Sequence, residues 1–447
     1  MKTKIVAIVE ALRGSLWFVP TLMMAFAIGL SFAMLALDKA FSGIRLKGMA
    51  LIYAGGAEGA RELLSSVSGS MITVAGVAFS VTVVALTLAS QQFGPRLLRN
   101  FMRDRGNQVV LGTFIATFIY CLLILRTIRG TDNGFVPHLS VTVGLVLAIA
   151  SLGVLIYFIH HVTNSIRAST IVAAVARDLE QAIERLFPSE IGTDPPRQAR
   201  GSSPAIPEDF DRQGRRLAAT ESGYLEAIDS ECLMRLATEH DLILRLPYRP
   251  GHFVSAGCTI LAAWPAERLT DGDIENMLEA FVIGDERTLL QDIEFSIDQL
   301  VEVAVRALSP GTNDPFTAMT SLDRLGSALS RLARREFPSP YRYDEAGQLR
   351  LIANPITFAG VVDAAFNQIR QYGRTSVPVT IRLLETIGTI AEQVRTDEAR
   401  TALLRHATMI LRGSREALPE EWDQQSVQER FKEAVEKLGR AEGHSGG

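Results

Sequence analysis

Four apolar stretches without any charged residue occupy the first third of the chain. They contain no Asp, Glu, Lys or Arg and cover Leu16–Leu37, Val67–Ser90, Val109–Leu125 and Leu139–Ile159. Because a helix rises ~1.5 Å per residue, about 20 residues cross the ~30 Å hydrocarbon core of a bilayer. The pattern therefore predicts an all-α, four-helix transmembrane domain over residues 1–161. The first stretch is longer than the apolar part of a signal peptide, so we expect it to be retained.

Mixed charged and apolar positions follow and predict a cytoplasmic α+β, mostly helical, C-terminal domain. Helical spacing continues over 162–187 and predicts a continuous extension of the fourth membrane helix. The Pro-rich stretch 188–214 is typical of a flexible linker. Short alternating runs predict a small β-rich module over 215–268, and helical periodicity predicts a mainly helical domain over 269–440. A loose tail is expected over 441–447.

Caps and turns predict several individual elements of this second half. Thr270 or Asp271 is expected to start a helix that runs to about Val282, and a second helix is expected to open at Gly284. A β-hairpin is expected over Tyr343–Ala353. Four more helices are expected over 356–372, 378–395, 398–412 and 421–438.

Charge and cysteine content narrow the function classes. The chain has 45 basic and 49 acidic residues, a net charge of −4, and so has no basic excess for nucleic acid. Its three cysteines are widely spaced, which indicates neither a disulfide framework nor a paired metal motif. With the N-terminus inside, eight basic residues flank the helices on the inner side against six on the outer side, and the inner loop 91–108 is the densest, which predicts cytoplasmic N- and C-termini.

The second apolar stretch carries a heptad stripe of small and weakly polar residues. Hydroxyl residues recur every seven positions, and glycines follow the first two by three residues: Ser66, Thr73, Ser80 and Thr87 with Gly69 and Gly76. Small residues allow close helix packing in lipid, and hydroxyls can bond across helices. The stripe is therefore either a helix-packing seam or the lining of a weakly hydrated path in an oligomer. Gln91 and Gln92 would lie at the cytoplasmic mouth, just before Gly94-Pro95 ends the helix.

Two further groups of residues could carry chemistry. His160 and His161 end the fourth apolar stretch, but adjacent helical residues point ~100° apart and chelate one metal poorly. Interfacial anchoring and pH sensing both remain open for them. Asp292, Gln299, Asn313 and Asp314 offer carboxylate and amide oxygens for a ligand or hard cation, whereas Asn313 and Asp314 also suit a helix cap before Pro315.

Five stretches of the chain resemble a family of bacterial inner-membrane proteins described only as predicted membrane proteins with a domain of unknown function. They are GGAEGAR at Gly55–Arg61, SQQFGPR at Ser90–Arg96, YFIHH at Tyr157–His161, GDERTLLQD at Gly284–Asp292 and ALSPGTNDPFTA at Ala307–Ala318. The resemblance implies four membrane helices, a cytoplasmic C-terminal domain and a bacterial inner-membrane location. It implies no activity.

No familiar enzyme motif occurs in the sequence. GxxxxGK[ST], GxGxxG, HExxH, CxxC and GxSxG are all missing, and no cofactor is expected. The leading hypothesis is an oligomeric channel or passive transporter with a cytoplasmic gating domain. The alternative is a membrane-anchored ligand-sensing or scaffold protein without transport. The expected partners are the lipid bilayer, further copies of the chain, and an ion or small molecule.

Overall fold

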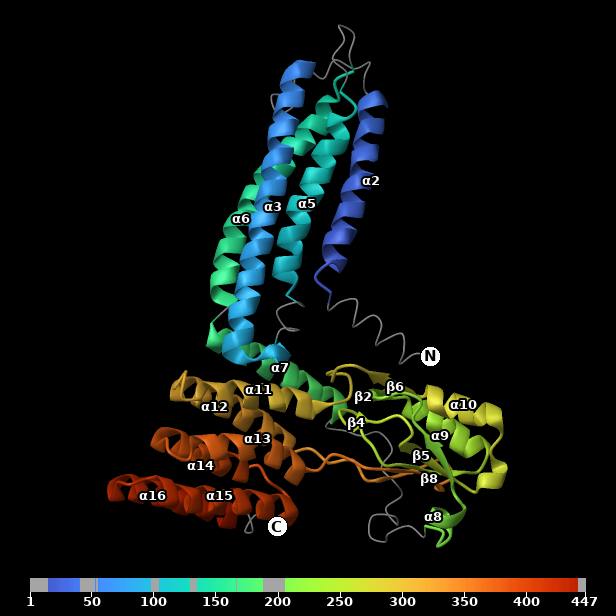
Figure 1. Cartoon of the computed structure of the whole chain (residues 1–447), viewed down its shortest axis with the longest axis vertical. Coiled ribbons are helices and arrows are strands. Elements are labelled where there is room, and N and C mark those ends of the chain that lie inside the picture. Colours follow the sequence, from blue (N-terminus) through green and yellow to red (C-terminus); the bar gives the residue numbers. More distant parts are fainter. Residues whose placement is uncertain are drawn as a thin grey trace. The chain divides into compact units, whose positions relative to one another are not determined.

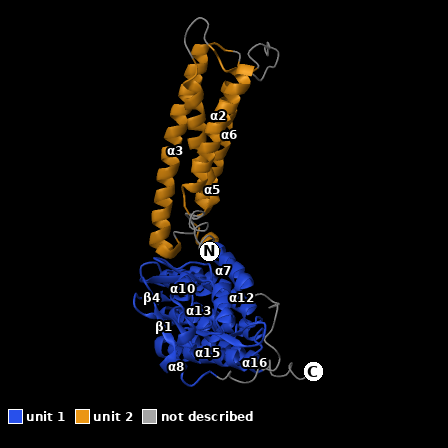
Figure 2. Ribbon diagram, turned by 90° about the vertical axis from the view of Figure 1, so that its right-hand side faces the viewer, with its two compact units in different colours: residues 1–7, 172–447 blue, residues 8–171 orange. Residues whose placement is uncertain are grey.

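The structure is a computed structural model that describes residues 15–40, 53, 55–97, 104–128, 135–165, 167–187 and 206–440. The chain forms two compact units, residues 8–171 and residues 1–7 with 172–447, which are coloured separately in Figure 2. The linker expected over 188–214 lies outside the described residues up to 205, and so does the tail over 441–447.

Four long apolar helices form the first unit (Figure 1). They are α2 (Phe18–Ala40), α3 (Ala57–Phe93), α5 (Arg105–Leu125) and α6 (His138–Ser165), and each is long and apolar enough to cross a membrane. α5 is the most buried of the four and packs against each of the other three. The four long apolar helices expected from the sequence are thus present. α3, with 37 residues, is ~55 Å long and exceeds the thickness of the hydrocarbon core.

The interior of this unit combines apolar packing with a few satisfied polar groups. Tyr120 and Cys121 of α5 pack with Leu64 of α3 in one cluster. Inside the unit, the Thr117 and Ser151 hydroxyl oxygens are 3.2 Å apart, and the Tyr120 hydroxyl donates to the Ser140 carbonyl oxygen at 3.0 Å. Buried polar groups without partners are costly in lipid, so these bonds fix how α5 and α6 face each other.

The expected continuous helix from the fourth span to residue 187 is wrong. α6 ends at Ser165, and a separate helix, α7, covers Ala168–Leu186. Asn164 and Ser165 next to the break are weak helix formers, so local propensity favours an end of the helix at this point.

Two sheets form one part of the second unit. The five-stranded sheet has the order β1-β5-β3-β8-β7 and the three-stranded sheet has the order β4-β2-β6. Among the strand pairs of the described residues, β3 and β8 alone are parallel. The strands are β1 (Arg215–Ala218), β2 (Gly223–Ile228), β3 (Ile243–Leu246), β4 (Phe253–Val254), β5 (Thr259–Trp264), β6 (Phe281–Gly284), β7 (Tyr341–Tyr343) and β8 (Leu349–Ala353). The β-rich module expected to end at residue 268 is therefore completed by three later strands.

Short helices accompany the sheets and share their core. α9 (Ser230–Glu239) and α10 (Asp271–Glu279) contribute Leu233 and Met277 to a cluster with Leu225 and Leu244 of the strands. Two 3-10 turns, η1 (Pro95–Leu97) and η3 (Ala266–Arg268), and the four-residue α8 (Phe210–Gln213) are the remaining short elements of the described chain.

Six helices form the other part of the second unit, stacked as hairpins in two layers (Figure 1). α11, α13 and α15 pack in succession in one layer, and α12, α14 and α16 do so in the other. Their bounds are α11 (Ile293–Ala307), α12 (Pro315–Leu332), α13 (Phe358–Gly373), α14 (Val377–Ala391), α15 (Asp397–Ala417) and α16 (Glu421–Arg440). Stacked helix pairs of this kind contact mainly their neighbours, as in repeat proteins. The mostly helical α+β fold expected from the sequence is confirmed.

Two helix boundaries differ from expectation. α10 is capped by Thr270 as expected but ends at Glu279, because residues 281–284 pair with β2 instead. The next helix begins at Ile293 and not at Gly284, because residues 285–292 form a loop with its own side-chain contacts. The expected hairpin is confirmed by the antiparallel pairing of β7 with β8, and the last four helices lie within a few residues of their expected bounds.

Candidate functional site

The heptad stripe of α3 faces away from the interior of the four-helix unit. Its hydroxyl and glycine positions, Ser66, Gly69, Thr73, Gly76, Ser80 and Thr87, are all exposed. A Cβ atom built on Gly69 or Gly76 meets no atom within 4 Å. The stripe therefore does not pack against another helix of the same unit, and a packing role for it requires a second molecule.

The buried side of α3 is made largely of alanine. Ala60, Ala75, Ala78 and Ala89 are buried there. Larger apolar residues flank the stripe: Ile72, Val77, Phe79, Val84 and Leu88 are more than 40% exposed, and Leu86 is half-buried. Residues four apart, such as Ser80 and Val84, are only about 40° apart around a helix, so these side chains lie beside the stripe. Small buried residues let α3 lie close to α5.

The hydroxyls of the stripe bond to their own helix. Thr73 donates to the carbonyl oxygen of Gly69, Ser80 to that of Gly76 and Thr87 to that of Val83, each at 2.9 Å. A hydroxyl satisfied in this way costs little in lipid, yet its oxygen can still accept a hydrogen bond. The exposed face of α3 is therefore weakly polar along its length.

The stripe ends as the sequence predicted. Gln91 and Gln92 are exposed in the last turn of α3. Gly94 follows with φ 112°, and its N–H donates to the carbonyl oxygen of Ser90. Glycine adopts this backbone conformation readily, and Pro95 cannot continue the helix.

The two histidines at the end of α6 have separate partners. His161 Nε2 lies 2.6 Å from Asp104 Oδ2, and its ring stacks on Tyr157 with centroids 5.2 Å apart. Asp104 also caps α5 by accepting from the N–H of Gly106. His160 is exposed and bonds to Asn164 Nδ2 at 2.9 Å. The pair does not converge on one point, and pH sensing by His160 and His161 stays a prediction.

The four residues suggested for a ligand or ion site are not gathered in one place. Asp292 is the N-cap of α11. Asp314 is the N-cap of α12 and lies beyond the C-terminal end of α11. Since α11 has 15 residues, these carboxylates flank a helix ~22 Å long. Gln299 is buried within α11, and Asn313 is exposed with φ 46°. Within the described residues, no three His, Cys, Asp or Glu side chains are grouped to hold a metal ion.

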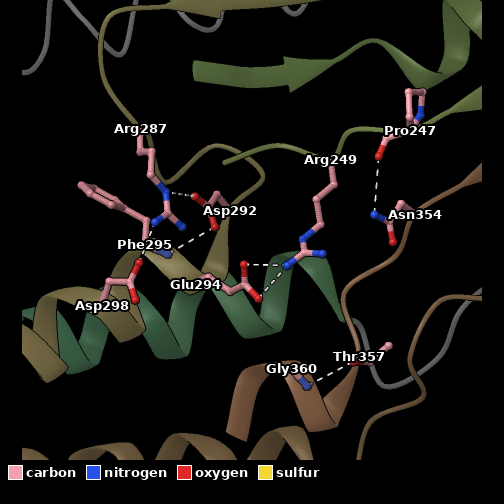
Figure 3. A network of polar contacts seen from close by, with 10 residues as sticks. All are labelled: Pro247, Arg249, Arg287, Asp292, Glu294, Phe295, Asp298, Asn354, Thr357 and Gly360. Atoms are coloured by element: carbon pink, nitrogen blue, oxygen red, sulfur yellow. Dashed lines mark hydrogen bonds and ion pairs between the residues drawn. The ribbon is translucent and has the colours of Figure 1, made fainter. Parts of the chain in front are cut away.

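A charged network surrounds Asp292 instead, at the start of α11 (Figure 3). Arg287 donates to Asp292 Oδ2 at 2.7 Å and to Asp298 Oδ2 at 2.6 Å. Asp292 is 4% exposed, and its other oxygen accepts from the N–H of Phe295. Burial raises the pKa of Asp292, against the opposing effect of Arg287, whereas the two carboxylates outweigh burial and hold the pKa of Arg287 above its usual range. The guanidinium bond and the N–H bond that Asp292 accepts are those of an ionised carboxylate.

The same loop holds the sheets to the helices. Gln291 accepts from the N–H of Ile228 at 3.0 Å and donates to its carbonyl oxygen at 3.1 Å, so one amide pairs with β2 like a strand residue. Arg249, between β3 and β4, donates to both oxygens of Glu294 on α11 at 2.8 Å (Figure 3). The Leu289 carbonyl oxygen accepts from Arg185 of α7. The GDERTLLQD stretch is therefore a joint between elements of the second unit.

Sequence reasoning missed several residues of these networks. Asp38, Asp104, Arg249 and Arg287 were not singled out. The available signal was position: Asp38 directly follows the first apolar run, and Asp104 lies shortly before the third. Arg249 carried no such signal, because its carboxylate partner Glu294 belongs to another element. Arg287 carried none because it was expected inside a helix that opened at Gly284, whereas it lies in a loop.

Together these features define a membrane protein with four candidate spans and a folded C-terminal unit of two sheets and stacked helices. The chain belongs to the DUF2254 family, described as predicted membrane protein, whose model matches residues 13–389. It is similar to uncharacterised proteins of Mycobacterium bovis and Mycobacterium tuberculosis, each 34% identical over 444 residues, covering 97% of this chain and 83% of the relative. No solved structure matches the chain.

Proposed function

We propose that this chain forms an oligomeric channel or passive transporter in the bacterial inner membrane, with the α3 stripe lining the path. The observation that carries the proposal is the exposure of every hydroxyl and glycine position of the stripe from Ser66 to Thr87. This face is more polar than a surface that contacts only lipid. It also does not pack against another helix of the unit. Hydroxyls can line a hydrated path without the cost of intramembrane charge.

The interior of one four-helix unit is packed, so a path would have to lie between several copies of the chain. Core side chains of α5 fill the space between α3 and α6, and the cavity beside Trp17 and Ala78 has a volume of about 20 Å³. A cavity of that size accommodates about one water molecule. Several copies arranged around α3 would place their stripes around a common axis. The C-terminal unit would then act as a cytoplasmic gating domain.

Cysteine scanning along α3 tests the path directly. The background is Cys232→Ser and Cys258→Ser, because these are the cysteines with exposed surface and Cys121 is buried. Ser80→Cys and Thr87→Cys are compared with their neighbours Val81→Cys and Leu88→Cys, which are exposed at the same depth but turned by ~100°. The proposal expects charged aqueous thiol reagents to modify the first pair and not the second. Equal protection of both pairs would reject the path.

Flux through purified protein in liposomes provides the functional measurement. Ser80→Trp should abolish ion or small-solute flux, while Val81→Trp should leave it unchanged. Zero flux of the wild-type protein for every solute tried would favour the alternative, a membrane-anchored sensor or scaffold. The stacked helices of the second unit would then be the part that binds a partner.

The proposed orientation can be tested with a native residue. Cys258 is exposed in the second unit. In intact spheroplasts a membrane-impermeant thiol reagent should leave Cys258 unmodified, and it should react after the membrane is opened. Modification in intact spheroplasts would place the second unit outside the cytoplasm.

A further inference from the structure

A groove with three arginines opens in the stacked helices of the second unit. It has a volume of about 390 Å³, within the range of small-molecule sites. The last turns of α13, the first half of α14 and the second half of α15 form its walls. Arg370, Arg374 and Arg412 line it together with Tyr372, and Glu416 is its one carboxylate.

The arginines of the groove lack the partners that arginines nearby have. On the same helices, Arg382 pairs with Asp323 and Arg405 pairs with Asp363. Among the described residues, no carboxylate lies within 4.0 Å of the guanidinium nitrogens of Arg370, Arg374 or Arg412. Three positive charges and one negative charge therefore leave the groove with an excess of two positive charges.

Arg370 is the most constrained of the three. Its Nε is buried without a hydrogen-bond partner, and one terminal nitrogen reaches Asn367 only at 3.5 Å. Burial lowers the pKa of Arg370, and the nearby charge of Arg412 adds to that effect. A buried donor without a partner and two adjacent like charges both cost folding free energy. A bound anion would remove both costs at once.

The helix dipole offers another explanation for Arg374, the C-cap residue of α13, and for Arg370, which lies in the last turn of that helix. A cation there is favoured by the helix dipole. Arg412 lies before the last turn of α15, so the dipole does not account for it. The dipole also leaves the buried Nε of Arg370 without a hydrogen-bond partner. Tyr372 is 55% exposed at the same groove and offers a ring face for stacking.

We propose that this groove binds a phosphate-bearing small molecule, with phosphate oxygens on Arg370 and Arg412 and a planar ring against Tyr372. Planar guanidinium groups match phosphate geometry, and arginine is the residue type that recognises it best. A nucleotide has both required parts. The proposal does not depend on transport, since it concerns a site in the second unit alone.

The test measures binding of ATP and of inorganic pyrophosphate to the full chain in phosphatidylcholine nanodiscs by calorimetry. Saturable binding of ATP to the wild type is expected, weakened about tenfold or more in Arg370→Gln and Arg412→Gln. Arg324→Gln is the matched control, because Arg324 is exposed on α12, outside the groove. Tyr372→Ala should weaken ATP binding and leave pyrophosphate binding unchanged.

Gly413→Leu blocks the groove without removing a charge. A Cβ atom at Gly413 meets nothing within 4 Å, so the side chain enters open groove space, and leucine favours the helix more than glycine does. This variant should unfold no more easily than the wild type and should lose ATP binding. Thermal unfolding of each variant separates lost binding from lost folding.

Three results would overturn the proposal. They are no saturable binding of either probe to the wild type, equal weakening by Arg324→Gln, and full binding to Gly413→Leu. Repeating the measurement with phosphatidylglycerol in the nanodiscs distinguishes the source of the phosphate. Unchanged affinity supports a soluble ligand, whereas competition by the lipid would assign the groove to a lipid headgroup.

Discussion

Asp38 and Ser140, 102 positions apart in the chain, are joined by two hydrogen bonds to one carboxylate oxygen. Asp38 Oδ2 accepts from the N–H of Ser140 at 2.9 Å and from its hydroxyl at 2.5 Å. The other oxygen accepts from the N–H of Leu139 at 2.9 Å. A residue at the end of α2 therefore caps the start of α6, where free N–H groups and the helix dipole favour a negative charge.

Asp38→Ala should destabilise the four-helix unit by about 2–3 kcal/mol, because it leaves N–H groups at the start of α6 without an acceptor. Asp38 is only 8% exposed, so water replaces the carboxylate poorly. Ser140→Ala removes only the hydroxyl and should cost about 1 kcal/mol. Denaturant unfolding in detergent, followed by circular dichroism, measures both. Equal costs would show that the backbone bonds contribute little.

Two glycines between β3 and β5 have similar backbone strain but different surroundings, so their alanine variants can be compared. Gly251 has φ 94° and Gly257 has φ 83°, so alanine is strained at both. A Cβ atom on Gly251 would also collide with the carboxylate of Asp292, whereas one on Gly257 meets nothing within 4 Å. Gly257→Ala should cost about 1–2 kcal/mol and Gly251→Ala about 1–3 kcal/mol more. Similar melting temperatures for the two variants would contradict this close approach.

Arg287→Met should destabilise the second unit by about 3–5 kcal/mol, since it leaves the buried carboxylate of Asp292 without its cation. Arg249→Met is the control, because the Arg249–Glu294 pair is more exposed and should cost less. Limited proteolysis between residues 285 and 292 should become faster in Arg287→Met. Protease resistance equal to that of the wild type would show that the loop does not depend on this arginine.

The sequence predicted what depends on local pattern and missed what depends on distant partners. Charge-free runs predict the four spans, and the capping residues predict the starts of α10 and α12, since a cap bonds within a few residues. The strand β6 could not be separated from the end of α10, because its partner β2 lies more than 50 positions earlier. Short apolar runs fit a strand and a helix equally well.

The candidate sites also divide into those that a local sequence pattern reveals and those that depend on distant partners. The heptad of α3 was visible because one helix carries all of it, but its exposure depends on how α5 packs. The groove of the second unit was not visible, because Arg370 and Arg412 come from helices that only packing brings together. The absence of carboxylate partners, on which the groove argument depends, is a property of the fold and not of the spacing.

Stability of the second unit should fall as the pH is lowered, and His406 should be one cause. His406 is fully buried between α13 and α15; its Nε2 lies 2.7 Å from Asp363 Oδ1, and its Nδ1 has no partner among the described residues. Burial lowers the pKa of His406 despite the opposing charge of Asp363, and the charges of Arg405 and Arg370 act in the same direction as burial. The folded protein therefore holds this imidazole neutral.

The direction of the pH dependence follows from proton uptake on unfolding. An unfolded histidine gains a proton below about pH 6.5, whereas the folded one resists it, so unfolding takes up a proton and is favoured as the pH falls through that value. His406→Gln keeps a donor for Asp363 and removes the titration. Urea unfolding from about pH 7.5 to about pH 5.5 should therefore show a smaller loss of stability in this variant than in the wild type.

The pKa of His252 is lowered by burial and by the charge of Arg249, so it contributes with the same sign. His252→Gln should flatten the profile separately, and the double variant should flatten it most, because the two histidines lie in different parts of the unit. If His406→Gln keeps the full pH dependence of the wild type, the buried imidazole is protonated as readily in the folded protein as in the unfolded chain.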